Sequence, residues 1–338
     1  MITIDGSFGE GGGQIVRSAL ALSMVTGKGF RIEKIRANRS KQGLLRQHLT
    51  ALQAAARISH AQVEGDHLGA SEFEFTPGDI TPGDYAFSIG TAGSTTLVLQ
   101  TVLLPLLTAG GASTLTLEGG THNPFAPPFD FLAKAYLPLI SRMGARVNAT
   151  LERPGFYPAG GGAIRIAIEP AQKLEPIEIL ERGKLLRRRA CAVIANLPDH
   201  IAERELQVFR KRLNWPAQQI EIERIENSPG PGNIVTIELE HEHVTEVFTG
   251  FGEVRRSAES VATHAVQQCQ RYLKSEAPVG EYLTDQLMLP LAVAGTGSFR
   301  ATCLSRHAQT HLRLIEQFVP TRIATEAGPG GETIVRFG

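Results

Sequence analysis

The sequence predicts an α/β protein with three repeated βαβα-type units in one large domain and a smaller α+β domain inserted into the third unit. The order strand, glycine-rich loop, helix, strand, polar loop and helix recurs along the chain. Matching strands begin near residues 30, 113 and 298. The two intervals become nearly equal once about 90 residues are removed from the second. We therefore expect a large domain at residues 1–183 and 277–338 and an inserted domain at 184–276.

The first unit opens with a short strand and the loop Gly9-Glu10-Gly11-Gly12-Gly13, and a helix at 14–25 follows. A strand at 30–36, a polar loop and a helix at 44–58 complete it. Backbone N–H groups at a helix N-terminus attract phosphate, although this loop fits neither the dinucleotide fingerprint nor the P-loop. It is either a tight turn or a phosphate-binding turn, and Glu10 favours a cation beside the phosphate.

The second unit repeats this order, with strands at 85–88 and 113–118, helices at 95–107 and 129–143, and a glycine-rich loop before the first helix. Gln100 lies inside the strongly apolar helix at 95–107. A buried glutamine needs a hydrogen-bond partner. A nucleotide base or a backbone group would satisfy it.

The third unit contains a helix at 282–294, a strand from Ser298, a polar turn and a helix at 307–318. The inserted segment has its own pattern, with strands at 187–197, 220–225 and 234–239 and helices at 201–213 and 257–274. Ser257 is the expected N-cap of the last of these helices. This order predicts a small α+β domain on two linkers.

The composition excludes several classes of protein. Of the 338 residues, 42% are hydrophobic and 20% charged, and the formal net charge is zero, so no general basic field attracts nucleic acid. Three widely spaced cysteines predict neither a disulfide framework nor a zinc site. The N-terminus lacks a signal-peptide pattern, and no apolar run reaches the roughly 18 residues of a membrane span. We expect a cytoplasmic protein with no membrane segment.

Polar clusters follow the same strand of each unit: Arg36 with Arg39, His122 with Asn123, and His307. Equivalent loops of packed repeats meet at one end of a structure, so we expect these clusters to converge. The basic residues near Arg36 form either a solvated edge or a phosphate clamp, because arginine holds phosphate oxygens bidentately.

Seven segments make the chain resemble the RNA 3′-terminal phosphate cyclase family over nearly its whole length. They are Gly9-Glu-Gly-Gly-Gly-Gln-Ile-Val-Arg17, Gly43-Leu-Leu-Arg-Gln-His48, Gly93-Ser-Thr-Thr-Leu-Val-Leu-Gln100, Asn123-Pro-Phe-Ala-Pro-Pro128, Gly155-Phe-Tyr-Pro-Ala-Gly-Gly-Gly162, Gly280-Glu-Tyr-Leu-Thr-Asp-Gln286 and the turn at His307. The resemblance implies three repeated units with an inserted domain, in agreement with the repeat found above.

The resemblance also implies a reaction. ATP adenylates His307, the AMP passes to an RNA 3′-phosphate, and the neighbouring 2′-hydroxyl attacks to give a 2′,3′-cyclic phosphate. The family pattern places Gln100 and the run Tyr282, Leu283, Thr284, Asp285 and Gln286 around adenine and ribose. It places Arg17, Arg36, Arg39, Gln47 and His48 around the phosphates or the RNA end, and Glu10 at a divalent metal, Mg²⁺ or Mn²⁺.

Two other classes of function remain as alternatives. A non-catalytic cyclase-like assembly factor in RNA maturation would lack the histidine, whereas His307, Glu10 and the arginine pair are all present. An enolpyruvyl-transferase-like enzyme shares repeated α/β units but needs no nucleophilic histidine. The sequence leaves open the physiological RNA, the role of His122, and the oligomeric state, including a homo-oligomer.

Overall fold

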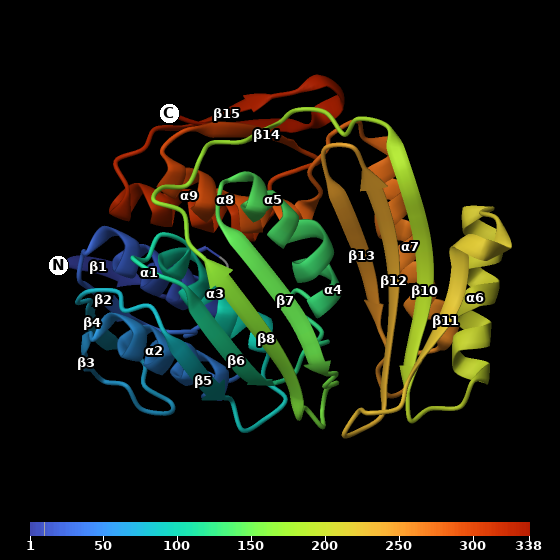
Figure 1. The fold of residues 1–338 in the computed structure, drawn as a ribbon, viewed down its shortest axis with the longest axis horizontal. Coiled ribbons are helices and arrows are strands. Elements are labelled where there is room, and N and C mark those ends of the chain that lie inside the picture. The colour runs from blue at the N-terminus through green and yellow to red at the C-terminus, as the bar shows by residue number, and fades with distance from the viewer. Residues whose placement is uncertain (10) are drawn as a thin grey trace.

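The computed structural model describes residues 1–9 and 11–338. It contains three similar units, and the sheets of these units surround their packed helices (Figure 1). Each unit has the order strand, helix, strand, helix, strand, strand. In every unit the sheet order is first, second, fourth, third strand. The first strand runs parallel to the second, and the two added strands complete the sheet antiparallel.

The elements of the units are as follows. The first unit contains β1 (Ile2–Asp5), α1 (Gly13–Thr26), β2 (Phe30–Glu33), α2 (Arg46–Ser59), β3 (Gln62–Glu64) and β4 (Phe73–Thr76). The second contains β5 (Asp84–Ser88), α3 (Thr95–Leu107), β6 (Ser113–Gly119), α4 (Phe129–Phe131), η1 (Leu132–Tyr136), α5 (Leu137–Arg142), β7 (Arg146–Arg153) and β8 (Gly162–Glu169). The third contains β9 (Glu178–Ile179), α8 (Glu281–Ala294), β14 (Gly297–Ala301), α9 (Arg306–Phe318), β15 (Ile323–Ala327), η3 (Pro329–Gly331) and β16 (Thr333–Phe337).

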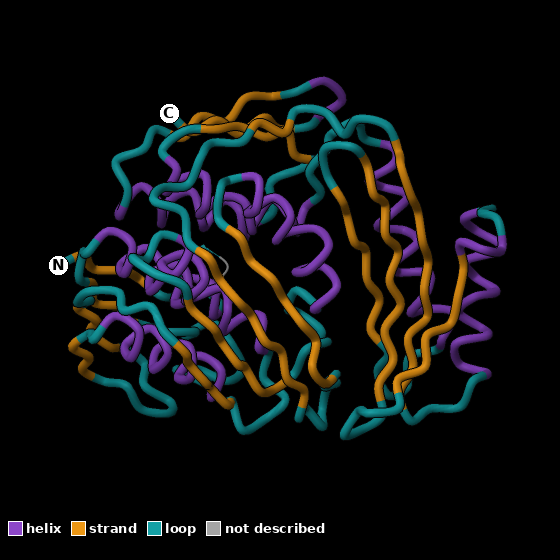
Figure 2. Tube along the Cα trace, viewed as in Figure 1, coloured by secondary structure: helices purple, strands orange, loops and turns teal. Residues whose placement is uncertain are grey.

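The helices lie between the three sheets, and α1 packs against α2, α3, α8 and α9 (Figure 2). Their burial follows from their apolar sequences. In α3 every side chain is buried except that of Gln100, which is partly exposed. A helix that is apolar all round belongs in the middle of a core, and a single polar position that is less buried marks where it meets a cavity.

The segment inserted between β9 and α8 in the sequence forms a separate sheet, on the right of Figure 1. Its elements are β10 (Leu185–Ala195), α6 (His200–Leu213), η2 (Ala217–Gln219), β11 (Ile220–Ile225), β12 (Gly232–His241), β13 (Thr245–Phe251) and α7 (Ala258–Lys274). The strand order is β11-β10-β12-β13, and α6 and α7 pack on this sheet. A hydrophobic cluster of its own, from Ala190 to Tyr272, fills the space beneath them. We propose residues 184–276 as the inserted domain.

Side chains from both parts fix the insert against the three units. Phe156, which is buried, packs with Cys191 and Ile234 of the insert sheet. Lys134 pairs with Glu238 at 3.1 Å. The guanidinium of Arg182 donates to backbone carbonyls in the last turn of α7 and in the returning linker, at 2.6–2.9 Å. These contacts join the insert to the body through both apolar packing and hydrogen bonds.

The predicted fold class is confirmed, and three local features differ from expectation. Each unit has two further strands. The strand expected at 30–36 ends at Glu33, because Lys34 and Arg36 adopt positive φ angles of 53° and 57°. The helix expected at 129–143 contains the π-helical turn η1. Pro138 has no N–H to continue the α-helical ladder at the end of that turn, which accounts for the change.

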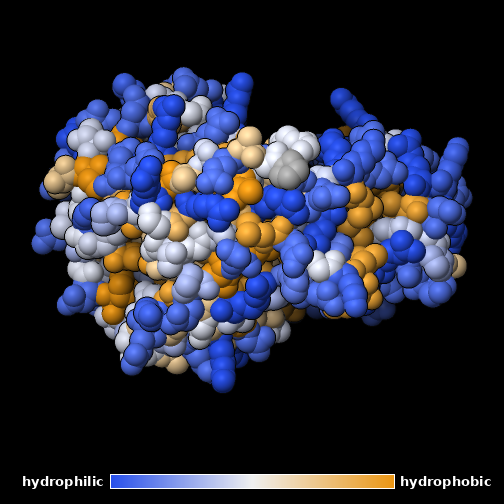
Figure 3. Space-filling model, turned by 90° about the horizontal axis from the view of Figure 1, so that it is seen from above, coloured by the Kyte–Doolittle hydropathy of each residue, from blue (hydrophilic) through white to orange (hydrophobic). Residues whose placement is uncertain are grey.

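The surface is mostly hydrophilic in the view of Figure 3, with smaller hydrophobic areas scattered over both parts of the molecule. Within residues 1–9 and 11–338, no helix combines the length and hydrophobicity needed to cross a membrane.

Candidate functional site

A cavity of about 750 Å³ lies where α1, α3, α8 and α9 meet the insert. Its polar part includes Arg17, Arg36, His48 and His307. Its apolar part includes Phe131, Tyr136, Leu289, Val247 and Phe251, from elements that pack together where β13 meets η1. A cavity of this size, with an apolar wall and a few convergent polar groups, has the character of a small-molecule site.

The polar part contains the guanidinium groups of Arg17, Arg36, Arg39 and Arg256. Among the described residues, no carboxylate pairs with Arg17 or Arg36 within 4.0 Å, and both guanidinium groups have lowered pKa values because of burial. For Arg17 the pKa falls to about 10, with the Arg36 charge as the second cause. Two partly buried arginines with no carboxylate partner among the described residues form a receptor for an anion, and phosphate oxygens match their geometry.

His48 lies beside these arginines and is fixed by its own helix. The backbone N–H of Leu45 donates to its Nδ1 at 3.1 Å, so Nε2 carries the proton of the neutral ring. Burial, followed by the charges of Arg17 and Arg36, lowers the His48 pKa to about 3. The ring is therefore a neutral donor that points into the cavity at physiological pH.

Glycine at position 13 allows this arrangement. A Cβ built on Gly13 would lie 2.2 Å from His48 Nε2 and 2.9 Å from Arg17 Nη1. The glycine-rich loop is therefore the place where α1 and α2 approach closely enough to bring the histidine and the arginine together.

Two of the predicted glutamines bridge elements at the cavity wall. Gln100 accepts a hydrogen bond from Arg17 Nε at 3.3 Å and donates to Gln286, which occupies the same position in the equivalent helix α8. The partner that a buried glutamine requires is thus a pair of side chains. Gln47 accepts from the backbone N–H of Ser94 at 3.2 Å, which ties α2 to the start of α3.

Helix α8 separates the predicted run 282–286 into two faces. Tyr282, Asp285 and Gln286 line the cavity, and Tyr282 is 55% exposed. Leu283 and Thr284 are fully buried on the other face, where Thr284 Oγ1 donates to the carbonyl of Gly280. Helical periodicity causes this separation. The side chains of Leu283 and Thr284, which we expected around adenine and ribose, therefore do not line the cavity.

His307 lies in the first turn of α9 and lines the cavity. Ser305 caps this helix, accepting from the Ala308 N–H at 3.0 Å and donating to Asp285 Oδ1 at 2.9 Å. The cap links the turn of His307 to α8. Burial lowers the pKa of His307, and the charges of Arg17 and Arg39 lower it further, which favours a neutral imidazole.

Gln14, Ser18 and His311 also line the cavity, although none of them is among the residues predicted from the sequence. His307 Nδ1 lies 2.6 Å from Gln14 Oε1. Gln14 and Ser18 are one turn apart on α1, as are His307 and His311 on α9. This i, i+4 spacing of polar residues on two amphipathic helices was the signal available in the sequence.

The insert contributes a wall that sequence analysis did not foresee. Thr249 and Phe251 of β13, together with Arg256 and His264, line the cavity opposite the three units. Burial and the charges of Arg256 and Arg271 lower the pKa of His264. The insert thus closes one side of the site.

The loops expected to converge do so in part. Arg36, Arg39 and His307 line one cavity. His122 instead stacks on Phe156 at 5.2 Å and lies 3.2 Å from Asp130, so it packs as a buried structural side chain. Asn123 donates to the Ala92 carbonyl. In the second unit, the segment that follows these residues, 124–128, reaches the cavity in their place.

The predicted metal ligand, Glu10, lies outside the described residues. In the part of the chain that the structure describes, no group of three or more His, Cys, Asp or Glu side chains gathers to hold a metal ion.

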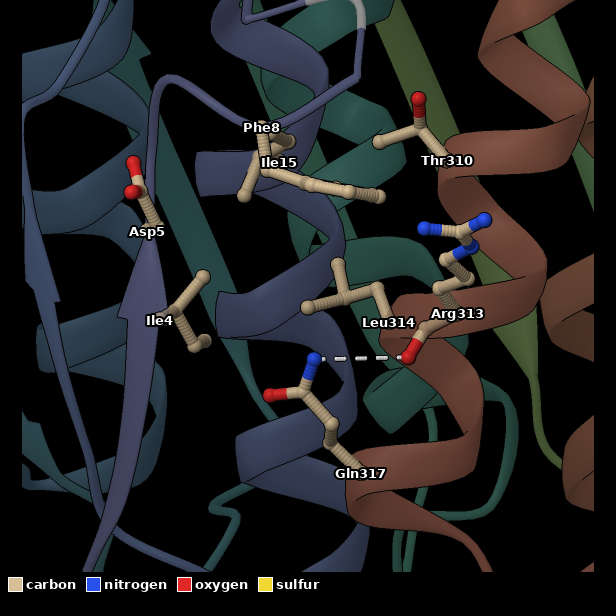
Figure 4. Close-up of a pocket in the computed structure, with 8 residues that line it drawn as sticks. All are labelled: Ile4, Asp5, Phe8, Ile15, Thr310, Arg313, Leu314 and Gln317. Atoms are coloured by element: carbon tan, nitrogen blue, oxygen red, sulfur yellow. Dashed lines mark hydrogen bonds between the residues drawn. The ribbon is translucent and has the colours of Figure 1, made fainter.

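A smaller cavity of about 230 Å³ lies on another face of α9 (Figure 4). Ile4, Phe8 and Ile15 face it from the first unit, and Arg313 stands 5.1 Å from the Phe8 ring centroid. Gln317 Nε2 donates to the Arg313 carbonyl at 3.4 Å, along the helix. This cavity contains none of the predicted site residues, so we place the candidate site at the larger cavity.

Comparison with known proteins gives a consistent result. Residues 8–325 match the family model described as RNA 3′-terminal phosphate cyclase. Proteins of that name are similar to this chain in Koribacter versatilis (54% identity, 95% of this chain and 90% of the relative) and in Pseudomonas fluorescens (50%, 99% and 97%). A relative of the same name in Salmonella typhimurium is 47% identical, over 98% of this chain and 97% of its own. The chain therefore belongs to the RNA 3′-terminal phosphate cyclase family.

Proposed function

We propose that this protein is an ATP-dependent RNA cyclase that converts a 3′-terminal phosphate into a 2′,3′-cyclic phosphate through a covalent histidine–AMP intermediate. The observation on which this depends is the position of His307. Its ring lies in the same cavity as two guanidinium groups, Arg17 and Arg36, that have no carboxylate partner among the described residues. Such a cavity suits attack by a neutral imidazole on an ATP phosphate.

In the first step, the lone pair of His307 attacks the α-phosphorus of ATP. The nitrogen–phosphorus bond forms, the bond from the α-phosphorus to the bridging oxygen breaks, and pyrophosphate leaves. Arg17 and Arg36 would stabilise charge on the phosphates, and exposed Arg39 at the cavity edge would add to this. A lowered pKa keeps His307 unprotonated for this attack at neutral pH.

In the second step, an oxygen of the RNA 3′-phosphate attacks the adenylate phosphorus and the nitrogen–phosphorus bond breaks. The 2′-hydroxyl oxygen then attacks the 3′-phosphorus and its proton passes to solvent, while the bond from the 3′-phosphorus to the bridging oxygen breaks and AMP leaves with that oxygen. Gln47 and His48 lie close to the arginines and would hold the RNA phosphate, with His48 as a neutral donor. The same pocket would thus bind the phosphates of ATP in the first step and the RNA phosphate in the second.

The adenosine would occupy the rest of the cavity. Tyr282 offers an exposed aromatic face, and Phe131 and Phe251 make the nearby wall apolar. Asp285, Gln100 and Gln286 supply polar atoms between the apolar wall and the arginines, where ribose hydroxyls would need partners.

We propose Glu10 as the protein carboxylate for a Mg²⁺ or Mn²⁺ ion. A cation bound through nucleotide phosphates takes one or two carboxylates from the protein and its other ligands from phosphate and water. Such an ion would neutralise charge on the phosphates.

We also expect the protein to act in the cytoplasm.

The test is covalent labelling with ATP radiolabelled at the α-phosphate, in the presence of Mg²⁺ or Mn²⁺. Wild type should acquire an acid-labile, alkali-stable label that His307→Ala lacks. His67→Ala, at an exposed histidine in the loop before β4, is the matched control and should label normally. An unlabelled, folded wild type would contradict the mechanism and favour a non-catalytic assembly factor.

The RNA acceptor is tested separately. An oligonucleotide with a 3′-phosphate should become resistant to phosphatase when it is incubated with enzyme and ATP, because a cyclic diester replaces the monoester. The same oligonucleotide with a 2′-deoxy end should accumulate the RNA-adenylate, because it has no hydroxyl to displace AMP. Because the adenylate also resists phosphatase, the two products are distinguished by mass: the RNA end should lose the mass of water, whereas the 2′-deoxy end should gain AMP. An RNA end that gains and keeps AMP would contradict cyclisation.

A further inference from the structure

We propose that Gln14 is a positioning residue that holds His307 as the tautomer with its proton on Nδ1, which leaves the lone pair on Nε2 for nucleophilic attack. This inference rests on the proposed function, because it assigns a role within the adenylation step. It adds a residue that the sequence analysis did not select.

The hydrogen bond between Gln14 and His307 determines the tautomer. Gln14 Oε1 lies 2.6 Å from His307 Nδ1. A carbonyl oxygen can only accept, so Nδ1 must donate. A neutral imidazole has one N–H, and Nε2 is then the unprotonated nitrogen.

A second hydrogen bond sets which end of the Gln14 amide faces His307. Gln14 Nε2 lies 3.3 Å from His311 Nδ1, and His311 Nε2 lies 2.5 Å from Ser18 Oγ. Both His311 and Ser18 are buried. Burial lowers the pKa of His311 to about 3, so its ring stays neutral. With Nε2–H donating to Ser18 Oγ, Nδ1 is the acceptor for the Gln14 amide. His311 therefore orients Gln14, and Gln14 orients His307.

The two helices make this chain of hydrogen bonds rigid. Gln14 and Ser18 project from one face of α1, and His307 and His311 project from the facing side of α9, with each pair four residues apart. Helices α1 and α9 pack against each other. Side chains on two packed helices are held in place more precisely than side chains on loops.

Among the described residues, charged or titratable groups near His307 come from several elements. Arg17 acts from α1, Arg39 from the loop after β2 and Glu281 from the start of α8, while His311 belongs to α9 itself. Gln14 is neutral and orients the ring without adding charge. A glutamate at position 14 would accept from Nδ1 in the same way but would raise the pKa of His307.

The tautomer is tested directly by ¹⁵N NMR of the imidazole rings in the nucleotide-free, full-length chain. Wild type should show His307 protonated at Nδ1. Gln14→Leu should lose that preference, and Gln317→Leu, at an exposed glutamine on α9, should keep it. A wild-type ring protonated at Nε2 would overturn the proposal. This readout needs no activity, so it is decided even where the proposed function fails.

The kinetic test is the single-turnover rate of labelling by ATP across pH. Gln14→Leu should label about 10- to 100-fold more slowly, the usual loss when a group that orients a reacting side chain is removed. ATP affinity, measured by calorimetry in a His307→Ala background, should stay unchanged. Gln14→Glu should recover most of the rate at high pH, with its acidic limb displaced to higher pH. Wild-type labelling rates in Gln14→Leu would refute the role.

Discussion

Replacement of Gly13 by alanine separates intrinsic helix propensity from the close approach that builds the site. Alanine in place of glycine within a helix normally stabilises it by roughly 0.5–1 kcal/mol. At Gly13, however, the new Cβ would lie 2.2 Å from His48 Nε2. Carbon and nitrogen need roughly 3.5 Å, so the ring must retreat by about 1 Å. Propensity and packing therefore predict opposite signs.

The cost follows from how His48 is held. Its ring is 1% exposed and accepts the Leu45 N–H at 3.1 Å, so a retreat both overpacks the core and breaks that bond. Overpacking costs about 1–3 kcal/mol and an unsatisfied donor about 1–3 kcal/mol more. After partial relaxation and the gain in propensity, we expect Gly13→Ala to destabilise the protein by roughly 1–3 kcal/mol.

The assay is chemical denaturation of wild type, Gly13→Ala, His48→Ala and the double variant. His48→Ala removes the ring, so in that background Gly13→Ala should become neutral or stabilising, which gives a large coupling energy. Gly110→Ala, where nothing lies within 4 Å of the new Cβ, is the control and should change stability little. An equal cost of Gly13→Ala with and without His48 would refute the reasoning.

Three further predictions concern the cavity and its supports. Burial raises the pKa of Asp285 to about 7, so the folded chain keeps a proton that the unfolded chain releases above about pH 4. The contribution of Asp285 to stability therefore falls as pH rises from about 4 to 7. The free energy of unfolding gained by Asp285→Asn should be larger at pH 8 than at pH 4, and a pH-independent difference would contradict the burial effect. Ser305→Ala removes the cap of α9 and should cost about 1 kcal/mol in urea unfolding. It should also slow labelling, because His307 is in the first turn; unchanged stability would show that the cap is dispensable. Phe156→Ala removes the ring between the units and the insert and should cost about 3–5 kcal/mol, measured by calorimetry. A loss below about 1 kcal/mol would mean that this contact does not fix the insert.

The site residues show how far local pattern reasoning extends. His307 was selected because it stands where a strand gives way to a helix, and the structure places it in the cavity. The run at 282–286 was selected as a block, yet only one face of α8 reaches the cavity, because successive helical residues point about 100° apart. The sequence contained that periodicity, but not which face meets the cavity.

The sequence by itself determined the elements whose cause is local. Apolar periodicity and capping residues define α3 at Thr95–Leu107, β11 at Ile220–Ile225 and the Ser257 cap of α7, and all three match the prediction. The repeat of strand and helix also followed from the sequence, because each unit repeats the same pattern of burial.

Only the tertiary structure decided contacts between residues far apart in the chain. The bond from Gln14 to His307 joins residues 293 positions apart, and the bond from Gln100 to Gln286 joins residues 186 apart. No local propensity encodes such pairs, since they result from how α1, α3, α8 and α9 pack. The insert wall at Thr249 and Phe251 has the same origin. Local chemistry therefore fixed which residues could act, and packing fixed which of them meet.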